Sequence, residues 1–499
     1  MKDAMARDET GQRRAGHAAV DEPVVDLVVA GAGGGLAGAL RAAEAGLGVL
    51  VVDPDEHFLR GNNTSMSTAM IPGAGSRWQR EAGVEDSPER FLSDISAKTH
   101  GTADPVLADA LARLSAPLVE WLADGAGLPL QLVRDFSYPG HSADRLHTVE
   151  GRHGSVLLRH LYERVRRAPT VDMLVPARLV DVVTSDRTGT NDPGAVTAAV
   201  VEYPGGRRET ITTRAVLLAT NGYGADRVRV ATHLPEIAAA DYHGGQFSRG
   251  DALGIGARLG ARSAFLDAYQ GHAALARRSR TLVGWATIMH GAIMVDAGGA
   301  RFGDETTGYS EYAAALAARP GAHGWIVLDR RIHDLCRSFT DFRETADAGA
   351  LVWADDVEQL AARTGMPAGA LAESLADQAA GAGAGGEGDP FGRTFFEAPL
   401  RAPYAAVEVV PALFHTQGGL TVDGDARVRG GDGGPIPGLY ASGGAAHGIS
   451  GHGAAGYLAG NGLLPALGLA WQAANDVARA HTLNPAHQHT GTPEEGTAP

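Results

Sequence analysis

The chain has 499 residues, of which 44% are hydrophobic and 20% charged, a balance typical of globular proteins and far from the polar bias of disordered chains. A single hydrophobic core seldom grows beyond about 300 residues, so we expect two domains. The net charge of -15 argues against nucleic acid or an anionic membrane surface as a partner, because both attract clustered positive charge.

The cysteine content and the N-terminal segment bear on the compartment. A single cysteine, Cys336, excludes an internal disulfide and a thiolate metal cluster within one chain, and it is consistent with a reducing cytoplasm. Residues 1–22 are charged and lack an apolar core, so we predict a disordered leader and no secretory signal. No stretch approaches the roughly 20 apolar residues that a membrane span needs.

The first predicted strand, Val24–Ala30, is short, apolar and rich in β-branched residues, as in a buried parallel strand. A glycine-rich turn and an alanine-rich helical segment follow, and GVLVVD then supplies a second strand that ends at Asp53. This βαβ unit predicts a dinucleotide-binding domain, in which the terminal acid accepts hydrogen bonds from an adenosine ribose.

The glycines after the first strand fit the pattern G-x-G-x-x-G in two registers. Counted from Gly31, the second glycine is Gly33 but Leu36 takes the last position; counted from Gly33, the series Gly33, Gly35 and Gly38 is complete. The order of the first strand, the helix, the second strand and the terminal acid is the order found in dinucleotide-binding sites. We therefore interpret the segment as a nucleotide site and leave its register open.

Later elements follow from patterning and turn signals. In chain order we predict an antiparallel meander within Val180–Asn221 that returns to the main sheet, helical segments in 250–262 and 357–379, a glycine-rich loop at 380–390, a buried strand within Gly438–Gly444, the glycine loop Ser450–Gly462 and an apolar helix through Trp471.

Six segments occur in the same order as the motifs of FAD-dependent fumarate reductases, succinate dehydrogenase flavoproteins and 3-ketosteroid dehydrogenases. They are VVAGAGGGLAGALRAAEAG, GNNTSMSTAMIPG, AVLLATNGYG, GGARFGDE, HTQGGLTVDGDARV and PIPGLYASGGAAHG. The chain resembles this family from about Val24 to about Ala480. The order of all six segments carries the resemblance, since each one alone is a weak signal.

The resemblance implies an α/β fold in which a Rossmann-like FAD-binding domain, with a parallel sheet and an antiparallel meander, is interrupted by an α+β capping domain. The implied divisions are a disordered leader (1–22), the first part of the FAD-binding domain (23–268), the capping domain (269–402), the second part of the FAD-binding domain (403–482) and a disordered tail (483–499).

FAD is the cofactor that the resemblance implies. The implied cofactor residues are Gly31, Gly33, Gly35, Asp53, Asn63, Thr64, Ser67, Ala219, Thr220, Gly418, Gly443, Asn461 and Leu463. Asn63 stands where some members carry a histidine bonded to FAD, so we expect noncovalent binding. Gly444 replaces a glutamate that many members place after GLYAAG. The helix after the glycine loop would point its positive N-terminus at the flavin, with Pro465 in its first turn.

Departures from the fumarate reductase pattern indicate the substrate class. Fumarate-type members place a histidine at the position of Phe414 and arginines at the positions of Tyr309 and Tyr457. A dicarboxylate needs such cationic partners when it is buried. Tyrosine at both positions instead resembles the ketosteroid dehydrogenases, whose G-Y-x-x-G form is matched by Gly456–Gly460.

Removal of hydrogen next to a carbonyl needs a base for the α-proton, donors for the enolate oxygen and a hydride acceptor. We assign Tyr309 as the base and Tyr457, with a backbone N–H near Gly460, as the oxyanion donor. His272 stands where fumarate-type members have a substrate histidine, although Ala273 replaces the proline after it. Tyr309, Tyr457 and His272 are thus the candidate catalytic residues.

Other aromatic and histidine side chains have a structural interpretation. Tyr138 lies in a turn sequence and is interpreted as a packing residue. His415, His447 and His452 lie in or beside loops predicted near the flavin and, taken singly, are interpreted as structural.

We therefore expect an FAD-dependent enzyme that dehydrogenates a bulky apolar ketone, 3-ketosteroid-like or polycyclic, to its α,β-unsaturated form. Two alternatives stay open: an ene-reductase of the fumarate reductase type acting on a non-dicarboxylate alkene, and a flavin-binding protein without turnover. The expected partners are a small ketone or enone and an electron acceptor. No metal, nucleic acid or membrane span is expected, and the sequence specifies neither the acceptor nor the oligomeric state.

Overall fold

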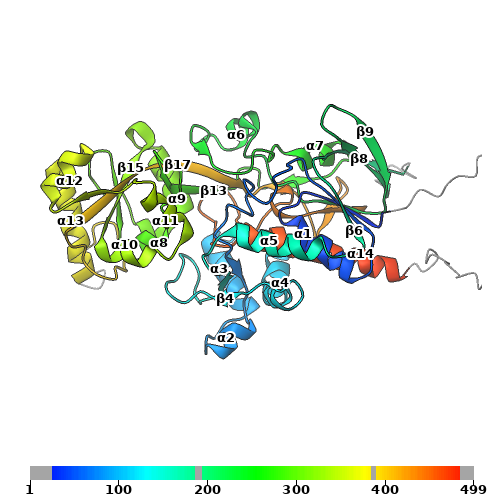
Figure 1. The fold of residues 1–499 in the computed structure, drawn as a ribbon, viewed down its shortest axis with the longest axis horizontal. Helices are drawn as coiled ribbons and strands as arrows, with labels where there is room; N and C mark the ends of the chain where they lie inside the picture. Colours follow the sequence, from blue (N-terminus) through cyan, green and yellow to red (C-terminus); the bar gives the residue numbers. More distant parts are fainter. Residues whose placement is uncertain (1–24, 186–193, 384–388, 484–499) are drawn as a thin grey trace, which may run out of the picture.

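The computed structural model describes residues 25–185, 194–383 and 389–483. Figure 1 shows two lobes, one built from both ends of the described chain and the other from its middle. The predicted leader and nearly all of the predicted tail lie outside the described residues.

The larger lobe is built on a six-stranded sheet with the strand order β19-β20-β10-β1-β2-β6. Every neighbouring pair is parallel except β19 with β20. The central strands are fully buried, as in a parallel sheet that is covered on both faces. The strands are β1 (Leu27–Ala30), β2 (Val49–Val52), β6 (Val171–Leu174), β10 (Val216–Leu218), β19 (Arg427–Arg429) and β20 (Pro435–Ala441).

Three helices run along this sheet: α1 (Gly35–Glu44), α5 (Gly154–Val165) and α14 (Leu463–Leu483). α1 and α14 approach closely because small residues face each other; a Cβ added to Gly38 would lie 2.7 Å from the Ala470 carbonyl oxygen. α14 has Pro465 in its first turn, as predicted, and continues well beyond Trp471. The two ends of the described chain are thus packed together in one domain.

The predicted meander is present beside the sheet, and a helical subdomain lies beneath the lobe in Figure 1. The meander consists of β7 (Arg178–Thr184), β8 (Val196–Glu202) and β9 (Arg208–Thr212), and it leads back into β10. The remaining elements are α2 (Arg77–Glu81), α3 (Pro88–Lys98), α4 (Pro105–Asp124), β3 (Ile71–Pro72), β4 (Gln131–Leu132), β5 (Leu146–Thr148), α6 (Arg227–His233), α7 (Asp251–Arg258), β12 (Ser263–Ala264), β18 (Gly419–Leu420) and η3 (Gly443–Ala445).

The second lobe is organised around one long strand, β17 (Tyr404–Thr416). β17 pairs in antiparallel fashion with β13, β15 and β16 and in parallel fashion with β11, so it reaches from the far end of this lobe to the first lobe (Figure 1). The other strands are β11 (Asp241–Tyr242), β13 (Tyr269–Ala276), β14 (Ile293–Asp296), β15 (Gly324–Asp329) and β16 (Val352–Ala354).

Short helices cover this second sheet. They are α8 (Ala286–Met289), η1 (Glu305–Thr307), α9 (Tyr309–Ala317), η2 (Pro320–Ala322), α10 (Arg330–Cys336), α11 (Thr340–Asp347), α12 (Val357–Thr364) and α13 (Ala368–Gly383). The helical region predicted at 357–379 is thus two helices separated at Gly365, and α13 extends into the first residues of the predicted glycine-rich loop. Residues 384–388 of that loop lie outside the described residues.

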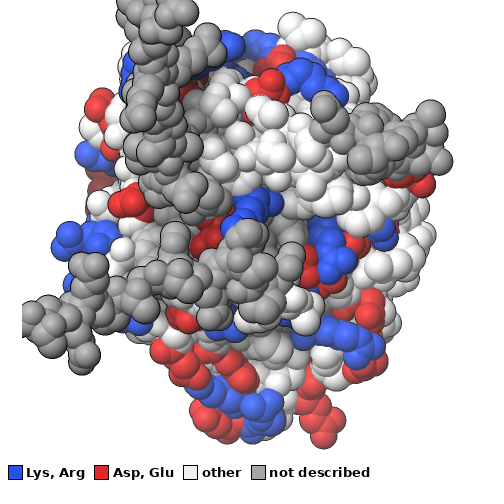
Figure 2. Space-filling view, turned by 90° about the vertical axis from the view of Figure 1, so that its right-hand side faces the viewer, with Lys and Arg blue, Asp and Glu red and all other residues white. Residues whose placement is uncertain are grey.

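The described surface is mixed in charge and carries no membrane-spanning helix. On the face shown in Figure 2, acidic and basic side chains lie interspersed. Many charged side chains of the described residues are ion-paired, such as Arg178 with Asp251 and Arg258 with Asp181. None of the helices in the described ranges is long and apolar enough to cross a bilayer.

Candidate active site

A large cavity lies between the two lobes and is lined by residues from both. Its walls come from the loops after β1, β2 and β10, from β13, α9 and the end of β17, and from the glycine loop before α14. Most residues predicted for cofactor or catalysis line it: Gly31, Gly33, Asp53, Asn63, Thr64, Ser67, Ala219, Thr220, His272, Tyr309, Gly443, Tyr457 and Leu463.

Gly35, Gly418 and Asn461 do not form part of this wall. A Cβ on Gly35 would lie 2.7 Å from Val29 Cγ1, and one on Gly418 would lie 2.1 Å from the Phe265 carbonyl oxygen, so both glycines allow close packing. Asn461 is fully buried and donates to Ser450 Oγ at 3.2 Å. The structure thus places these three residues behind the cavity, where they support its wall.

The nucleotide end of the cavity is formed at the carboxyl edge of the parallel sheet. Gly31 ends β1 at φ 112°, a left-handed conformation that favours glycine, and it lies against Ala219. Asp53 Oδ2 accepts from the Ala32 N–H at 2.7 Å, and Oδ1 accepts from the Asp55 N–H at 2.9 Å. Burial raises the pKa of Asp53 to about 6. The acid therefore stands beside the glycine turn, as the βαβ pattern predicted.

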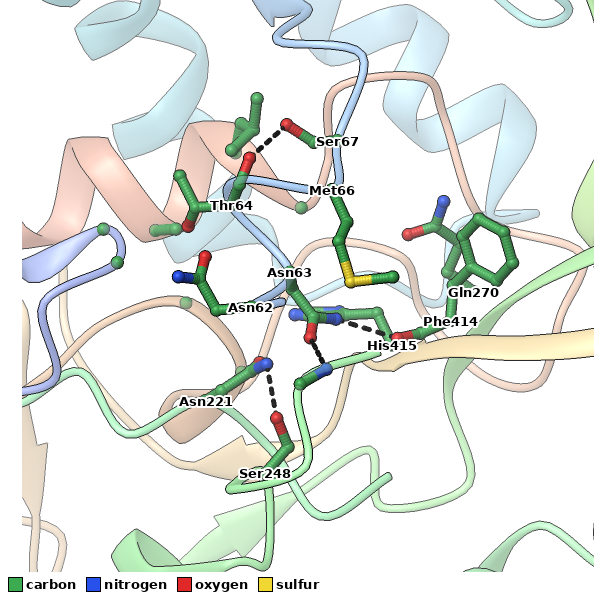
Figure 3. Close-up of a pocket in the computed structure, with 18 of the residues that line it drawn as sticks. Asn62, Asn63, Thr64, Met66, Ser67, Asn221, Ser248, Gln270, Phe414 and His415 are labelled. Atoms are coloured by element: carbon green, nitrogen blue, oxygen red, sulfur yellow. Dashed lines mark hydrogen bonds between the residues drawn. The ribbon is translucent and has the colours of Figure 1, made fainter. Parts of the chain in front are cut away.

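The segment Asn62–Ser67 lines the middle of the cavity (Figure 3). Asn63 is held at both ends of its amide: Nδ2 donates to the Phe414 carbonyl at 2.8 Å and Oδ1 accepts from the Gly245 N–H at 2.7 Å. Ser67 Oγ donates to the Thr64 carbonyl at 2.8 Å. Asn63 thus connects the segment Asn62–Ser67 to the end of β17 through a hydrogen bond.

The residues present fit FAD. The cavity presents a glycine turn at a helix start, the acid at the end of β2, and the N-terminus of the 21-residue α14. Two hydroxyls in its wall, Thr220 Oγ1 and Ser442 Oγ, are buried and have no hydrogen-bond partner among the described residues. Buried polar groups of this kind normally have partners, and a polar cofactor would provide them.

Tyr309, Tyr457 and His272 lie together in the cavity. The ring of Tyr309 contacts that of Tyr457 edge to face, with centroids 5.8 Å apart, and it stacks on His272 at 4.8 Å. Tyr309 and Tyr457 are 148 residues apart in the sequence, and the fold brings their rings into contact.

The two phenols are not equivalent. Burial raises the pKa of Tyr309 well above 10, and neighbouring Tyr457, Tyr138 and Glu311 raise it further. Burial also raises the pKa of Tyr457, but the nearby Gly462 backbone and the Tyr309 hydroxyl oppose that increase.

His272 is a neutral hydrogen-bond donor in this geometry. Its Nδ1 accepts from the Ala274 N–H at 3.1 Å, which leaves the ring proton on Nε2. The ring is buried and also stacks on Phe414 at 5.1 Å. Burial lowers the pKa of His272 to about 3, so this side chain is not a proton carrier near neutral pH.

The RFGDE segment supports Tyr309. Arg301 donates to Glu305 through Nε at 3.0 Å and through Nη2 at 2.8 Å, and Arg393 donates to the same carboxylate at 3.1 Å. All three side chains are buried. The chain then turns at Gly308, which has φ 141°, and begins α9 at Tyr309. The buried ion pairs thus fix the start of the helix that carries the tyrosine.

The structure separates the three histidines that the sequence grouped near the flavin. His415 lines the cavity, and burial lowers its pKa to about 4. His447 lies behind the wall, 3.6 Å from Asp104, and His452 pairs with Asp267 at the surface. Tyr138, interpreted as a packing residue, lines the cavity and packs in a cluster that Tyr309 also contacts.

Several cavity residues carry no sequence signal. Trp285 on the cap side stands edge-on to His272 at 5.8 Å, and Arg152 lies in the wall beside Phe339. Each is an isolated residue in a segment without a motif, and its place in the site depends on how the two lobes pack.

Comparisons with known proteins agree with this geometry. The family model for the FAD binding domain matches residues 26–463. The probable fumarate reductase Ifc3 of Shewanella frigidimarina is 30% identical over 433 residues, which cover 85% of this chain and 70% of that protein.

Solved structures agree as well. The open conformation of a flavocytochrome c3 fumarate reductase has a TM-score of 0.74 at 28% identity, covering 91% of this chain and 78% of that chain. The 3-ketosteroid-delta4-(5alpha)-dehydrogenase of Rhodococcus jostii RHA1 shares the fold, with a TM-score of 0.70 at 23% identity over 92% of this chain and 98% of that chain. The chain therefore belongs to the FAD binding domain family, with fumarate reductases among its relatives, and it is an FAD-dependent oxidoreductase that acts on CH–CH groups.

Proposed function

We propose that this protein dehydrogenates the C–C bond next to the carbonyl of a bulky, largely apolar ketone. The observation that carries the proposal is the contact between Tyr309 and Tyr457 in the cavity. These tyrosines, together with Phe414, occupy the positions at which a dicarboxylate-binding relative would present two arginines and a histidine. A phenol and a phenyl ring cannot compensate two buried carboxylates.

The residues have distinct tasks in this reaction. Tyr309 removes the α-proton, and the Tyr457 hydroxyl donates to the carbonyl oxygen as negative charge develops on it. The Nε2–H of His272 is a second donor, fixed in orientation by its Nδ1 contact and its stacking. Bound FAD supplies the acceptor for the β-hydrogen as hydride.

Noncovalent attachment of FAD is part of the proposal. Asn63, at the position of the covalent histidine in some members, has an amide that is not a nucleophile, and both its ends are engaged by backbone groups. FAD released intact on acid denaturation would support this assignment, whereas flavin that stays with the precipitated protein would contradict it.

The reverse reaction is the second candidate. Both the matched fumarate reductase and the flavocytochrome c3 structure are closer in sequence, at 30% and 28%, than the ketosteroid dehydrogenase at 23%. An ene-reductase would use the same tyrosines in the opposite sense. Anaerobic mixing separates the two directions: a ketone that bleaches oxidised flavin supports dehydrogenation, and an enone that reoxidises reduced flavin supports reduction.

Tyr309→Phe is expected to slow reduction of the flavin by a ketone at least about 100-fold, because general acid–base catalysis contributes roughly that much or more. Since burial raises the pKa of Tyr309 well above 10, the wild-type rate should also increase with pH from 7 to 9. Stopped-flow absorbance measures both effects.

Tyr312→Phe is the matched control. Tyr312 lies one turn along the same helix, outside the cavity, and its hydroxyl has no partner among the described residues. The Tyr312→Phe substitution should leave the rate of flavin reduction unchanged. Normal flavin reduction in Tyr309→Phe with FAD retained would rule out Tyr309 as the base.

A further inference from the structure

Arg152 lies in the cavity wall away from the motif-defined residues. It precedes α5, in a turn where both Gly151 and Arg152 have positive φ, at 75° and 50°. A non-glycine residue in this conformation persists only where its surroundings hold it. The Arg152 side chain is 17% exposed. Its guanidinium carbon lies 4.5 Å from the ring centre of Phe339 in the second lobe and 5.7 Å from that of Phe136.

The guanidinium of Arg152 is only partly satisfied. Nη2 donates to Asp135 Oδ2 at 2.7 Å, whereas Nη1 is buried and has no hydrogen-bond partner among the described residues. A buried donor on a charged group is costly to leave unpaired. Asp341, another acid in this part of the wall, does not fill the role, since burial raises its pKa to about 7 and no hydrogen bond joins it to Arg152 among those described.

A row of aromatic rings connects Arg152 with the catalytic tyrosines. Phe136 packs edge to face against Tyr138 at 4.8 Å. Tyr138 belongs to the cluster that Tyr309 contacts. Phe136 itself lies behind the cavity wall and contacts Phe339, which lines the cavity, at 5.9 Å. A ligand whose carbonyl lies between Tyr309 and Tyr457 can therefore extend along Tyr138 and Phe339 toward the unpaired Nη1 of Arg152.

We propose that the substrate is a keto acid: its ketone lies at Tyr309 and Tyr457, its apolar body along Tyr138 and Phe339, and its carboxylate at Nη1 of Arg152. This inference rests on the proposed function and narrows it to a ketone with one acidic group at the end remote from the reacting bond. One cation and an aromatic wall suit a single carboxylate and not a dicarboxylate held close to the flavin.

The cofactor is the other possible source of an anion at this position. Gly154, two residues after Arg152, packs against the Thr64 carbonyl in the segment assigned to FAD. A cofactor phosphate on Nη1 would make Arg152 a residue of FAD binding. The two sources differ in what a variant changes: FAD affinity in one case, the preference for an acidic ketone in the other.

The test compares keto acids with neutral isosteres on the flavin-loaded enzyme. The probes are a cyclohexanone with an acetate arm and oxocholanate, a steroidal ketone with a carboxylate side chain, each paired with its primary amide. The acid of at least one pair should have a kcat/KM about 10- to 100-fold above that of its amide, as expected for a charge-assisted hydrogen bond. Arg152→Gln should reduce this ratio to near one, and Arg152→Lys should restore part of it.

Arg134→Gln is the control, because Arg134 is exposed on a neighbouring segment outside the cavity; it should keep the wild-type ratio. Equal kcat/KM for acid and amide in the wild type would overturn the inference while leaving the proposed function intact. Loss of FAD affinity in Arg152→Gln with an unchanged ratio would also overturn it, and would assign the arginine to the cofactor.

If no ketone reduces the flavin, the proposed dehydrogenation fails, and binding then decides the inference separately. Titration of the flavin absorbance with each probe gives its Kd. Tighter binding of the acid that is lost in Arg152→Gln supports the carboxylate site, whereas equal Kd values for acid and amide contradict it.

Discussion

Asp53 illustrates how burial sets the properties of a single side chain. Its carboxylate accepts two backbone N–H groups at the end of β2, yet burial outweighs them and raises its pKa to about 6. The group is therefore ionised at neutral pH but close to its midpoint in mildly acidic solution.

FAD affinity should accordingly depend on pH. The ionised Asp53 is the better acceptor for ribose hydroxyls, so the Kd for FAD should rise as pH falls through about 6. Asp53→Asn should bind FAD more weakly at pH 7.5, by about tenfold for one lost charge-assisted bond, with a flatter pH dependence. Fluorescence titration of the apoprotein measures both. A wild-type Kd that is constant from pH 5 to pH 8 would contradict the assigned role.

The residues proposed for catalysis and substrate binding differ in how far the sequence could predict them. Tyr309 and Tyr457 stand at fixed spacings from motifs, so their positions could be predicted before the fold was known. Arg152 could not, because its neighbour Phe339 lies 187 residues later in the chain and only the packing of the cap brings the two together. The sequence analysis, which predicted a bulky apolar ketone, therefore included no cation in the substrate site.

At the level of elements, local pattern predicted β1, α1 and β2 well, because a buried parallel strand and a small-residue helix have strong sequence signatures. β17 was not predicted as a unit. It continues through Pro411 and is stabilised by pairing with four strands that are remote in sequence. Nonlocal pairing of this kind leaves no periodic trace in the strand itself.

The contact between α1 and α14 gives a prediction at the same scale. Gly38→Ala should destabilise the protein by about 1–3 kcal/mol, because the added Cβ would lie 2.7 Å from a backbone oxygen of α14 that cannot move freely. Urea denaturation monitored by circular dichroism measures the free energy of unfolding.

Gly254→Ala in α7 is the matched substitution, since its Cβ would meet only Arg258 Nη1, at 3.8 Å. It should stabilise by about 0.5–1 kcal/mol through helix propensity. If both variants had equal stability, close packing of α1 on α14 would not be the constraint at Gly38.

At the scale of the whole molecule, an ion pair joins the two lobes at α9, the helix that begins with Tyr309. Lys98 at the end of α3 pairs with Glu311 of α9 and donates to the Thr307 carbonyl at 2.7 Å. Both side chains are largely buried, at 11% and 22% exposure. Burial raises the pKa of Glu311, and Lys98 opposes that increase.

Lys98→Met should destabilise the protein more at pH 8 than at pH 5. A carboxyl whose pKa is raised on folding loses stability as pH increases from its unfolded pKa through its folded one, and removal of Lys98 raises the folded pKa further. As the pH falls, a growing fraction of Glu311 is protonated in the variant and needs no cation. Thermal denaturation at the two pH values measures the difference.

Lys98→Met should also lower kcat/KM about tenfold, equivalent to roughly 1.4 kcal/mol. The substitution removes an ion pair that holds the lobe carrying Tyr309 against the other lobe. Arg113→Met, which removes exposed pairs with Asp109 and Glu89, is the control and should change neither property. A pH-independent loss of stability in Lys98→Met would show that Lys98 acts through packing and not through its charge.

The interleaving of the chain ends has a consequence for biosynthesis. β20 and α14, which complete the main sheet and cover α1, come from the last 65 residues of the chain, as do Gly443, Tyr457 and Leu463 of the cavity wall. At a translation rate of about 5–20 residues per second, the N-terminal glycine turn waits tens of seconds for these partners. The nascent protein therefore cannot complete its cofactor site until the segment from β20 to α14 has been translated, and loading with FAD follows the synthesis of that segment.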